Sequence, residues 1–381
     1  MKIFFDARAL TNKRTSGIDE YIRLLTEKLL DIDHKNKYEF FTNGFTKSYF
    51  PKAFEEKENV SRISWRIPNK ILDSLSLVFH EPKINRITNA DIIFSPHFNL
   101  LNVSKNSKRI ITFHDLSFIH FPEFYPLRKR FWHFQQDLKR QIKEATRIIA
   151  VSDFTAQDLK NTFSVPEEKI QRIYSGINTF YKKLPKDETL KFRESRRLKN
   201  PFLLFVGVLE PRKNIGSVIA SFSALKEKYI FRDLKLVIAG KNGWLCDKIF
   251  KEASHSKSKN DIIFWGESSF EDLRFLYNTC EAFIYPSFFE GFGFPPLEAQ
   301  ACGAPVVISN RSSFPEIIGN SGFLVDPWRI DEQISALEEL LTNNSLRSKF
   351  VERGFKNTER FSWETTAHEF LKTFNAAVKY G

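Results

Sequence analysis

Cysteine is scarce in this sequence, and its spacing excludes several kinds of site. Among 381 residues only Cys246, Cys280 and Cys302 are cysteines, and no two of them form a Cys-x-x-Cys pair. Zinc ribbons and dithiol redox centres need such pairs, so we expect neither. Scattered thiols are also typical of a reducing compartment rather than of a disulfide-stabilised secreted protein.

Long apolar segments are missing as well. The apolar run Ile3–Phe5 near the start ends at Asp6 and is too short for a secretory signal peptide. No stretch of about 18 uncharged apolar residues occurs, and a membrane-spanning helix needs roughly that length. The sequence therefore predicts a cytoplasmic protein without a transmembrane helix.

Common nucleotide and metal motifs are absent too. Neither GxxxxGK[ST] nor HExxH occurs, and no GxGxxG follows the first predicted strand. A P-loop, a zinc protease site and a nicotinamide or flavin site are thus not expected. No Asp-x-Asp follows a strand, so the usual carboxylate ligands of a metal-bound nucleotide are missing. We therefore expect no metal and no cofactor. If the protein binds a nucleotide diphosphate, cationic side chains must neutralise its charge in place of a metal.

Positive charge is in excess, and it lies in one half of the chain. Residues 1–200 contain 37 Lys and Arg against 24 Asp and Glu, a net +13, whereas residues 201–381 contain 21 against 22, a net −1. A basic half favours docking on anionic lipids at the inner face of a cell membrane. The segment Phe124–Lys143 mixes Arg, Lys, Phe and Trp as an interfacial surface does. A solvated basic surface over a packed helix explains both features equally well.

Short apolar runs alternate with helical patterns along the whole chain. Strands separated by helices predict parallel sheets with helices on both faces, so the fold class is α/β. The predicted strands are Lys2–Phe5, Tyr38–Thr42, Asp91–Ser95, Arg109–Phe113, Arg147–Val151, Phe202–Val206, Leu234–Ala239, Ile262–Trp265, Ala282–Tyr285, Pro305–Ile308 and Gly322–Val325. The predicted helices are Gly17–Leu30, Phe131–Ala145, Thr155–Phe163, Ile215–Lys228, Phe270–Asn278, Pro296–Ala301, Phe314–Ile318, Asp331–Thr342, Asn344–Thr358 and Trp363–Lys379.

The alternation pauses once, which suggests two domains. The stretch Tyr181–Asn200 is rich in Lys and Arg with few large apolar residues, and we take its middle as a linker. The predicted domains are residues 1–185 and 186–362, each a doubly wound sheet. Parallel sheets bind ligands at the carboxyl ends of their strands, so we expect two such edges to face each other across a cleft.

A cationic pair follows the first strand of the second half. The strand Phe202–Val206 ends at Gly207, and Arg212 and Lys213 precede a helix that begins near Ile215. The free N–H groups of a helix N-terminus favour an anion, and a guanidinium binds a phosphate in bidentate fashion. The pair therefore predicts a diphosphate site. The alternative is an exposed Arg-Lys pair in a loop.

Two carboxylates flank a glycine loop farther along the chain. Glu290 precedes the loop and Glu298 follows it, with seven residues between them. We expect Gly291 and Gly293 to allow positive φ and to expose backbone N–H groups to an anion. A Pro-Pro pair then presets a helix start, which puts Glu298 in the first turn. Two carboxylates so placed can accept hydrogen bonds from the hydroxyls of a ribose and a hexose.

Weaker candidates lie in the first half. His114 ends a predicted strand, with Asp115 beside it to orient or charge it, and His97 is a candidate of the same kind. Lone histidines are more often structural. The run Arg14-Thr15-Ser16-Gly17-Ile18 between the first strand and helix contains one glycine, Gly17, that could approach a phosphate.

The motifs of the second half resemble the signature of family 4 glycosyltransferases, which have the GT-B fold. The resemblance is carried by Gly207–Asn214, by the spacing of Glu290 and Glu298, and by Ala301–Val307 and Ser312–Glu316. In the first half, the runs Phe113-His114-Asp115-Leu116-Ser117-Phe118 and Val151-Ser152-Asp153-Phe154 add to it.

The resemblance implies a role for each candidate residue. It implies that Arg212 and Lys213, with Gly17, hold the diphosphate of a nucleotide-sugar donor, and that Glu298 binds the ribose. Glu290 would bind the transferred sugar and act with His114 at the reacting centre. The last helix, 363–381, would pack back onto the first domain. The loop lining sugar and phosphate would be Glu290, Gly291, Phe292, Gly293, Phe294 and Pro295, and a weaker acceptor site would contain His97 and Asp115.

The same resemblance implies the reaction. Such enzymes transfer a hexose with retention of configuration and without a metal. The run Phe113–Phe118 and the Ser-Asn-x-Ser-Ser run that begins at Ser309 are most similar to bacterial O-antigen and capsule mannosyltransferases. GDP-mannose is therefore the favoured donor, a UDP-sugar such as UDP-glucose the next, and a glycan or lipid-linked saccharide the acceptor. We place the residues that read the base near Gly266–Leu273.

Two rival functions remain at this point. One is a sugar-nucleotide epimerase on the same fold, although no acid/base motif for it is visible. The other is a non-enzymatic basic protein that binds a membrane or nucleic acid. The second rival explains the net charge of +13 but not Glu290, Glu298 and the glycine loop, so we expect no nucleic acid partner.

Overall fold

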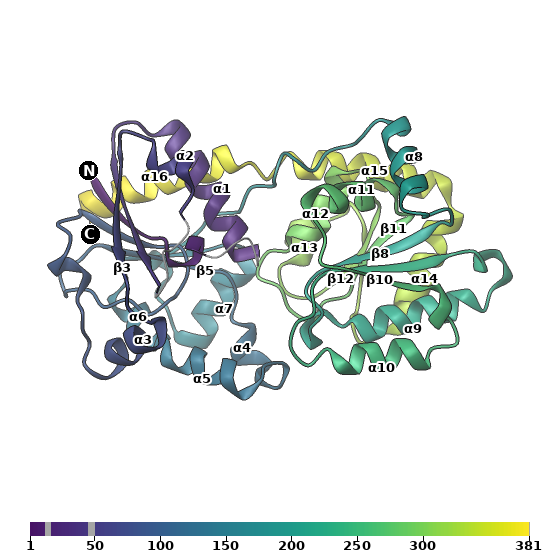
Figure 1. The fold of residues 1–381 in the computed structure, drawn as a ribbon, viewed down its shortest axis with the longest axis horizontal. Helices are drawn as coiled ribbons and strands as arrows, with labels where there is room; N and C mark the ends of the chain where they lie inside the picture. Colours follow the sequence, from purple (N-terminus) through teal and green to yellow (C-terminus); the bar gives the residue numbers. More distant parts are fainter. Residues whose placement is uncertain (12–16, 45–49, 381) are drawn as a thin grey trace. The chain divides into compact units, whose positions relative to one another are not determined.

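Two parallel sheets organise the computed structural model, which describes residues 1–11, 17–44 and 50–380 (Figure 1). Tertiary contacts group these residues into two units. Unit 1 comprises Met1–Phe118, Leu127–Gly176 and Ser362–Gly381, and unit 2 comprises Ile119–Pro126 and Ile177–Phe361. The short segment Ile119–Pro126 thus belongs to unit 2, and the main boundary between the units lies between residues 176 and 177. The domain boundary suggested by the sequence lies between residues 185 and 186.

Unit 1 contains a seven-stranded parallel sheet in the order β3-β2-β1-β4-β5-β6-β7. Strand order reverses between the neighbours β1 and β4, as in a doubly wound fold. The strands are β1 (Lys2–Asp6), β2 (Lys37–Asn43), β3 (Val60–Trp65), β4 (Ile92–Ser95), β5 (Arg109–Phe113), β6 (Arg147–Ala150) and β7 (Ile170–Arg172).

Helices cover both faces of the unit 1 sheet (Figure 1). Apolar residues from both sides pack on the strands, and the largest fully buried side chains include Phe4, Phe5, Phe94 and Phe113. The last helix, α16, packs against α1 within this unit. The helices are α1 (Gly17–Ile32), α2 (Lys52–Glu55), α3 (Asn69–Val78), α4 (Ser117–His120), α5 (Leu127–Gln135), α6 (Leu138–Glu144), α7 (Asp153–Phe163) and α16 (Trp363–Tyr380), with 3-10 turns η1 (Arg8–Thr11), η2 (Ile84–Arg86) and η4 (Glu167–Lys169).

Unit 2 repeats this plan with a six-stranded parallel sheet in the order β10-β9-β8-β11-β12-β13. Its order reverses between β8 and β11. The strands are β8 (Phe202–Val206), β9 (Lys235–Ala239), β10 (Ile262–Gly266), β11 (Ala282–Tyr285), β12 (Val306–Ser309) and β13 (Phe323–Val325). Each lies within two residues of a predicted strand, so the α/β prediction is confirmed.

Helices again lie on both faces of the sheet (Figure 1). Helix α9 packs against α10 and α14, and α12 packs against α11 and α15. The helices are α8 (Lys186–Ser195), α9 (Ile215–Lys226), α10 (Asp247–His255), α11 (Phe270–Thr279), α12 (Phe294–Ala301), α13 (Phe314–Ile318), α14 (Ile330–Thr342) and α15 (Asn344–Thr358), with 3-10 turns η3 (Pro122–Phe124), η5 (Pro211–Lys213), η6 (Tyr229–Phe231) and η7 (Lys259–Asp261).

Two local predictions are wrong, and some helices were not predicted. The predicted helix Phe131–Ala145 is two helices, α5 and α6, because Asp137 adopts a left-handed φ of 45° between them. The stretch Tyr181–Asn200 is not an open linker, because it contains α8, whose Phe192 ring stacks on Phe275 at 4.6 Å between centroids. Helix α10 was not predicted at all.

Candidate functional site

The candidate site of unit 2 lies where strand order reverses. The chain leaves β8 through η5 into α9, and it leaves the neighbouring strand β11 through a loop into α12. Asn214, with φ of 55°, turns the chain between η5 and α9, and its side chain donates to the carbonyls of Pro286 and Pro327. Because β8 and β11 are adjacent, the two predicted motifs meet at one edge of the sheet.

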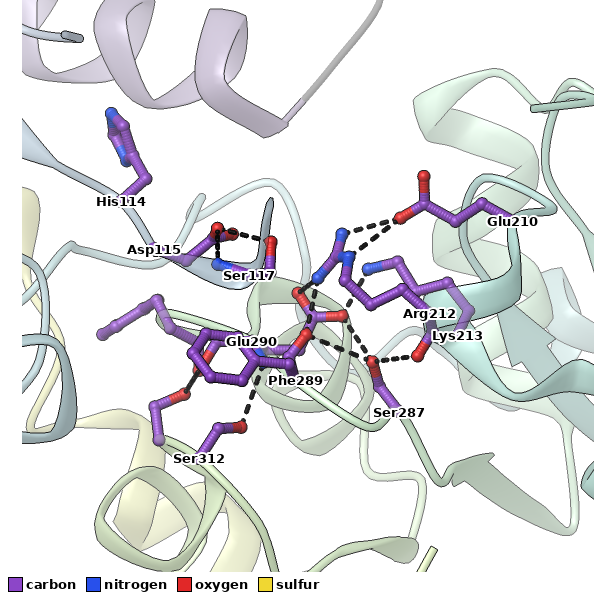
Figure 2. Close-up of polar contacts among 12 residues, drawn as sticks. His114, Asp115, Ser117, Glu210, Arg212, Lys213, Ser287, Phe289, Glu290 and Ser312 are labelled. Atoms are coloured by element: carbon purple, nitrogen blue, oxygen red, sulfur yellow. Dashed lines mark hydrogen bonds and ion pairs between the residues drawn. The ribbon is translucent and has the colours of Figure 1, made fainter. Parts of the chain in front are cut away.

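Glu290 is the centre of this site (Figure 2). Its carboxylate lies 2.5 Å from Lys213 Nζ and 2.9 Å from Arg212 Nη1, and it accepts a hydrogen bond of 2.8 Å from Ser287 Oγ. The Tyr285 hydroxyl, 3.4 Å away, also donates to it. Glu290 itself is 9% exposed, so these charges and hydrogen bonds act with little screening by water.

The surroundings hold Glu290 in its ionised form. Burial alone would raise its pKa, but the charges of Arg212 and Lys213 and the hydrogen bonds from Lys213 and Ser287 outweigh burial and lower the pKa to about 2. For Lys213, burial and the charge of Arg212 lower the pKa, while Glu290 and Glu210 oppose that change.

Arg212 is fixed on two sides at once. Its Nε and Nη2 donate to Glu210 Oε1 at 3.1 and 2.7 Å, and its Nη1 donates to the carbonyl of Phe289 at 2.6 Å. The guanidinium thereby links the loop after β8 to the loop after β11. A planar fork with its donors already directed is suited to bind an anion without a large entropy loss.

Glu298 lies deeper in the helix than predicted. Helix α12 begins at Phe294 rather than at Pro296, with Gly293 as its N-cap, so Glu298 stands in the second turn. Its carboxylate is buried and accepts a hydrogen bond of 2.9 Å from the Tyr277 hydroxyl. The hydrogen bond ties the Glu298 carboxylate to α11, to which Tyr277 belongs.

Only one of the two loop glycines has the predicted backbone conformation. Gly293 adopts φ of 103°, whereas Gly291 has no positive φ. A Cβ added to Gly293 would lie 2.7 Å from Cε1 of Phe314, a fully buried ring. The start of α12 therefore depends on the absence of a side chain at this position.

Replacing Gly293 by Ala is expected to destabilise the fold by about 2 kcal/mol or more, since the change adds a steric overlap to an unfavourable φ. Urea denaturation of both proteins measures this difference. Gly266→Ala is the matched control, because Gly266 also has positive φ, 81°, but a Cβ there would meet no atom of the described part of the chain within 4 Å. Equal losses in the two variants would show that the contact with Phe314 is unimportant.

The first-half candidates belong to unit 1. His114 follows β5, and its Nε2 donates to the carbonyl of Pro96 at 2.9 Å, while its ring packs edge-on against Tyr21 at 4.6 Å. Burial lowers the pKa of His114, although the Pro96 carbonyl and the Asp115 charge oppose this. His114 is therefore neutral at pH 7, with Nδ1 as its acceptor atom.

Asp115 and His97 differ in their surroundings. Asp115 Oδ1 accepts from the backbone N and Oγ of Ser117 at 2.9 and 2.6 Å, so the carboxylate caps the start of α4 (Figure 2). His97 lies beside His114, with ring centroids 5.7 Å apart, and its buried Nδ1 has no hydrogen-bond partner among the residues that the structure describes. Burial, followed by the charges of His114 and His133, lowers the pKa of His97 well below its usual value.

The remaining predicted positions are less informative. Gly17 is the exposed first residue of α1 in unit 1, and Arg14-Thr15-Ser16 lie outside the described residues. Within the described ranges, no group of three or more His, Cys, Asp or Glu side chains is arranged to hold a metal, and no helix is long and apolar enough to cross a membrane.

One cavity of about 300 Å³ lies away from the Glu290 carboxylate. It is formed between α8 and α11, and it includes Ser269, Glu271 and Asp272 of the predicted base-reading stretch. None of Arg212, Lys213 and Glu290 lines it. The contacts of the charged groups at the β8–β11 edge, rather than the size of this cavity, therefore define the candidate site.

Comparison with known proteins decides the family. A model described as Glycosyltransferase Family 4 matches residues 15–180, and one described as Glycosyl transferases group 1 matches residues 186–357. The O-antigen chain mannosyltransferase B of Escherichia coli is 30% identical over 284 residues, which are 74% of this chain and 74% of that protein. The chain belongs to the family 4 glycosyltransferases.

Two further comparisons bear on the length and the fold of this glycosyltransferase. The serotype-specific mannosyltransferase WbdA of Escherichia coli is 30% identical over 276 residues, but the match covers 71% of this chain and only 34% of WbdA. Sucrose-phosphate synthase from Thermosynechococcus elongatus superimposes with a TM-score of 0.78 over 98% of both chains at 18% identity. That likeness concerns the fold, and the predicted GT-B class is confirmed.

Several residues around the glycosyltransferase site were not predicted. Ser287, Tyr285 and Glu210 contact Glu290 or Arg212, and Tyr277 contacts Glu298. They are ordinary residues of strands, helices and loops, without a spacing that singles them out. Their contacts become visible only in the fold, which places β8 beside β11 and α11 beside α12.

An aromatic segment also escaped prediction. His120 and Phe121 pack their rings against Phe289, at 5.4 and 5.9 Å between centroids, and Phe124 stacks on Phe288 at 5.6 Å. These contacts explain why Ile119–Pro126 groups with unit 2 although it lies within the first half of the sequence. They also hold the loop whose carbonyl at Phe289 binds Arg212 in this glycosyltransferase.

Proposed function

We propose that the protein is a retaining, metal-independent mannosyltransferase that uses GDP-mannose. Its acceptor is a glycan or a lipid-linked saccharide of a bacterial surface polysaccharide. The relatives in support are named as O-antigen chain and serotype-specific mannosyltransferases. The observation that carries the proposal is the meeting of Arg212, Lys213 and Glu290 at the strand-order reversal of unit 2.

The cations bind the leaving diphosphate. Arg212 and Lys213 both contact Glu290, so this carboxylate holds the two cations in place beside the position of the diphosphate. Gly17 adds a close backbone approach to the phosphates. Because guanidinium and ammonium neutralise the charge that develops on the diphosphate, no metal is required.

The carboxylates bind the two sugars of the donor. Glu290 accepts hydrogen bonds from hydroxyls of the mannose, and Glu298 accepts them from the ribose. The depressed pKa of Glu290, about 2, keeps it an acceptor at every physiological pH. The backbone between Gly291 and Pro295 lines the mannose and the phosphates.

The reacting centre includes neutral His114. A neutral imidazole near the anomeric carbon contacts the transferred sugar without repelling the positive charge that develops there, and its lowered pKa suits that role. His97 and Asp115 contribute to the acceptor site. The acceptor hydroxyl attacks on the face from which the diphosphate departs, and a phosphate oxygen takes its proton. Configuration is thus retained, and no side chain needs to act as a general base.

A thermal-shift panel of sugar nucleotides tests the donor. GDP-mannose at a hundredfold excess over its Kd is expected to stabilise the protein by about 2.7 kcal/mol through mass action, whereas UDP-glucose, dTDP-glucose and ADP-glucose are expected to have smaller effects. Radiolabelled transfer from GDP-mannose to saccharide acceptors then tests the reaction. A larger thermal shift with UDP-glucose would identify UDP-glucose as the preferred donor instead of GDP-mannose. No thermal shift with any of the four sugar nucleotides would refute the donor site.

A further inference from the structure

A tyrosine that belongs to none of the predicted motifs holds the ribose candidate Glu298. The Tyr277 hydroxyl donates to Glu298 Oε2 at 2.9 Å. Tyr277 is 0% exposed and Glu298 is 7% exposed. A fully buried side chain has no surface for a bound nucleotide to contact, so Tyr277 can act on a ligand only through its neighbours. Glu298 keeps a small exposed part, so it can contact both Tyr277 and a ligand.

The surroundings make this hydrogen bond a strong one. Burial raises the pKa of Tyr277 well above its usual value, and the charge of Glu298 raises it further, so the hydroxyl stays protonated and remains a donor. A hydrogen bond to an ionised carboxylate is roughly twice as strong as one between neutral groups. A carboxylate has about four acceptor positions, so the bond from Tyr277 orients Glu298 and is compatible with further bonds from a ribose.

The tyrosine is itself anchored by its neighbours in unit 2. Its ring packs edge-on against Tyr181 and Phe283, with ring centroids 5.7 and 5.6 Å away. Phe283 is a fully buried residue of the central strand β11. The next residue of α11, Asn278, accepts a hydrogen bond of 2.8 Å from the backbone N of Leu184. The Tyr277 hydroxyl is therefore held in place by a strand, a helix and the segment that precedes α8.

We propose that Tyr277 is a positioning residue for the ribose of the donor. Its hydroxyl holds the Glu298 carboxylate in the orientation in which the 2′- and 3′-hydroxyls of the ribose donate to it, and Tyr277 does not contact the nucleotide. This role rests on the proposed function, in which Glu298 binds the ribose. Because the diphosphate separates the ribose from the anomeric carbon, Tyr277 contributes to donor binding and not to the chemical step.

Tyr277→Phe removes the hydroxyl and keeps the ring contacts. Isothermal titration compares GDP or UDP, whichever binds the wild type more tightly, with its 2′,3′-dideoxy form. We expect the wild type to prefer the nucleotide with ribose hydroxyls by about 10- to 100-fold, the factor that one hydrogen bond to a charged group contributes. In Tyr277→Phe this preference should fall by at least about fivefold. The KM for the sugar nucleotide should rise while kcat stays within about twofold.

Tyr38→Phe is the matched control. Tyr38 is also a buried tyrosine whose hydroxyl donates to a carboxylate, Asp33 Oδ2 at 2.6 Å, but it lies on β2 in unit 1. Urea denaturation should show that both variants fold and that both lose some stability. The preference for ribose hydroxyls and the KM for the donor should change in Tyr277→Phe alone, since a merely structural hydrogen bond would move neither.

Glu298→Asp tests the same role with Tyr277 in place, so the test stands even if Tyr277→Phe does not fold. The shorter side chain draws the carboxylate back from the tyrosine hydroxyl, and we expect a similar fall in the preference for ribose hydroxyls.

An unchanged preference in folded Tyr277→Phe or in Glu298→Asp would overturn the positioning role alone. A wild type that binds the dideoxy form equally well, or binds neither GDP nor UDP, would overturn it together with the assignment of Glu298 to the ribose. Tighter binding of UDP than of GDP would correct the proposed donor and leave the positioning role to be judged by the two variants.

Discussion

Glu290→Gln is expected to lower kcat of transfer by about 10²- to 10³-fold while the fold is retained. Gln has nearly the same shape, so Ser287 and Tyr285 keep an acceptor. The amide carries no charge, and it can neither fix Lys213 and Arg212 as the carboxylate does nor accept strongly from a sugar hydroxyl. A preorganised charged group at a reacting centre is commonly worth this much. Initial rates at saturating donor and acceptor measure the loss.

Glu39→Gln is the matched control for this variant. Glu39 is also a buried carboxylate that faces a lysine, with Lys2 Nζ at 2.7 Å, but it lies on β2 in unit 1. We expect its replacement to leave kcat within about twofold, since it contacts none of the candidate site residues. A Glu290→Gln enzyme as active as the control would contradict the role of Glu290 in the proposed site.

Glu290→Gln is also expected to change how the free energy of unfolding depends on pH. The pKa of Glu290 falls from 4.5 to about 2 on folding, so its ionised form contributes stability above pH 4.5, and this contribution is lost as pH falls toward 2. The difference amounts to about 3 kcal/mol at neutral pH. In urea denaturation, wild type and Glu290→Gln should therefore differ most at pH 7 and converge below pH 3, and a difference independent of pH would argue against the ionised carboxylate.

Central strands were easier to predict than the two edge strands of the unit 1 sheet. The runs Phe202–Val206 and Ala282–Tyr285 are continuous, apolar and buried on both faces, and their bounds were predicted exactly. The edge strands β3 and β7 were missed, because Val60–Trp65 alternates with Ser and Arg and Ile170–Arg172 has only three residues. An edge strand is covered on fewer sides, so its sequence has a weaker apolar signal.

Site residues could be predicted where charged side chains stand beside glycines and strand ends, and not where their residue type and spacing are common. Arg212, Lys213 and Glu290 stand out by residue type next to glycines and strand ends, and the structure brings all three together. No sequence pattern connects Tyr277 to Glu298, because that contact joins two neighbouring helices, α11 and α12, across 21 positions of the sequence. Glu298 was also assigned to the wrong turn of its helix α12, since a Pro-Pro pair marks a helix start only to within a residue or two.

Arg212→Lys is expected to weaken binding of GDP by about 10- to 100-fold. Lysine keeps the charge but cannot donate to Glu210 and to the carbonyl of Phe289 while it also contacts a phosphate. A charge-assisted hydrogen bond contributes about 1.5–3 kcal/mol, and that range sets the expected factor. Isothermal titration with GDP and with guanosine separates the effects, because guanosine has no phosphate and should bind both proteins equally.

Arg347→Lys is the matched control, since Arg347 also binds a carboxylate of unit 2, Glu281, at 2.5 Å, but belongs to α15. It should bind GDP like the wild type. If Arg212→Lys lost affinity for guanosine as strongly as for GDP, Arg212 would act by holding the loop at Phe289 rather than by contacting phosphate. Unchanged affinity for GDP and for guanosine would show that Arg212 is not part of the donor site. Among the described contacts of the Glu290 carboxylate, Lys213 would then be the remaining cation.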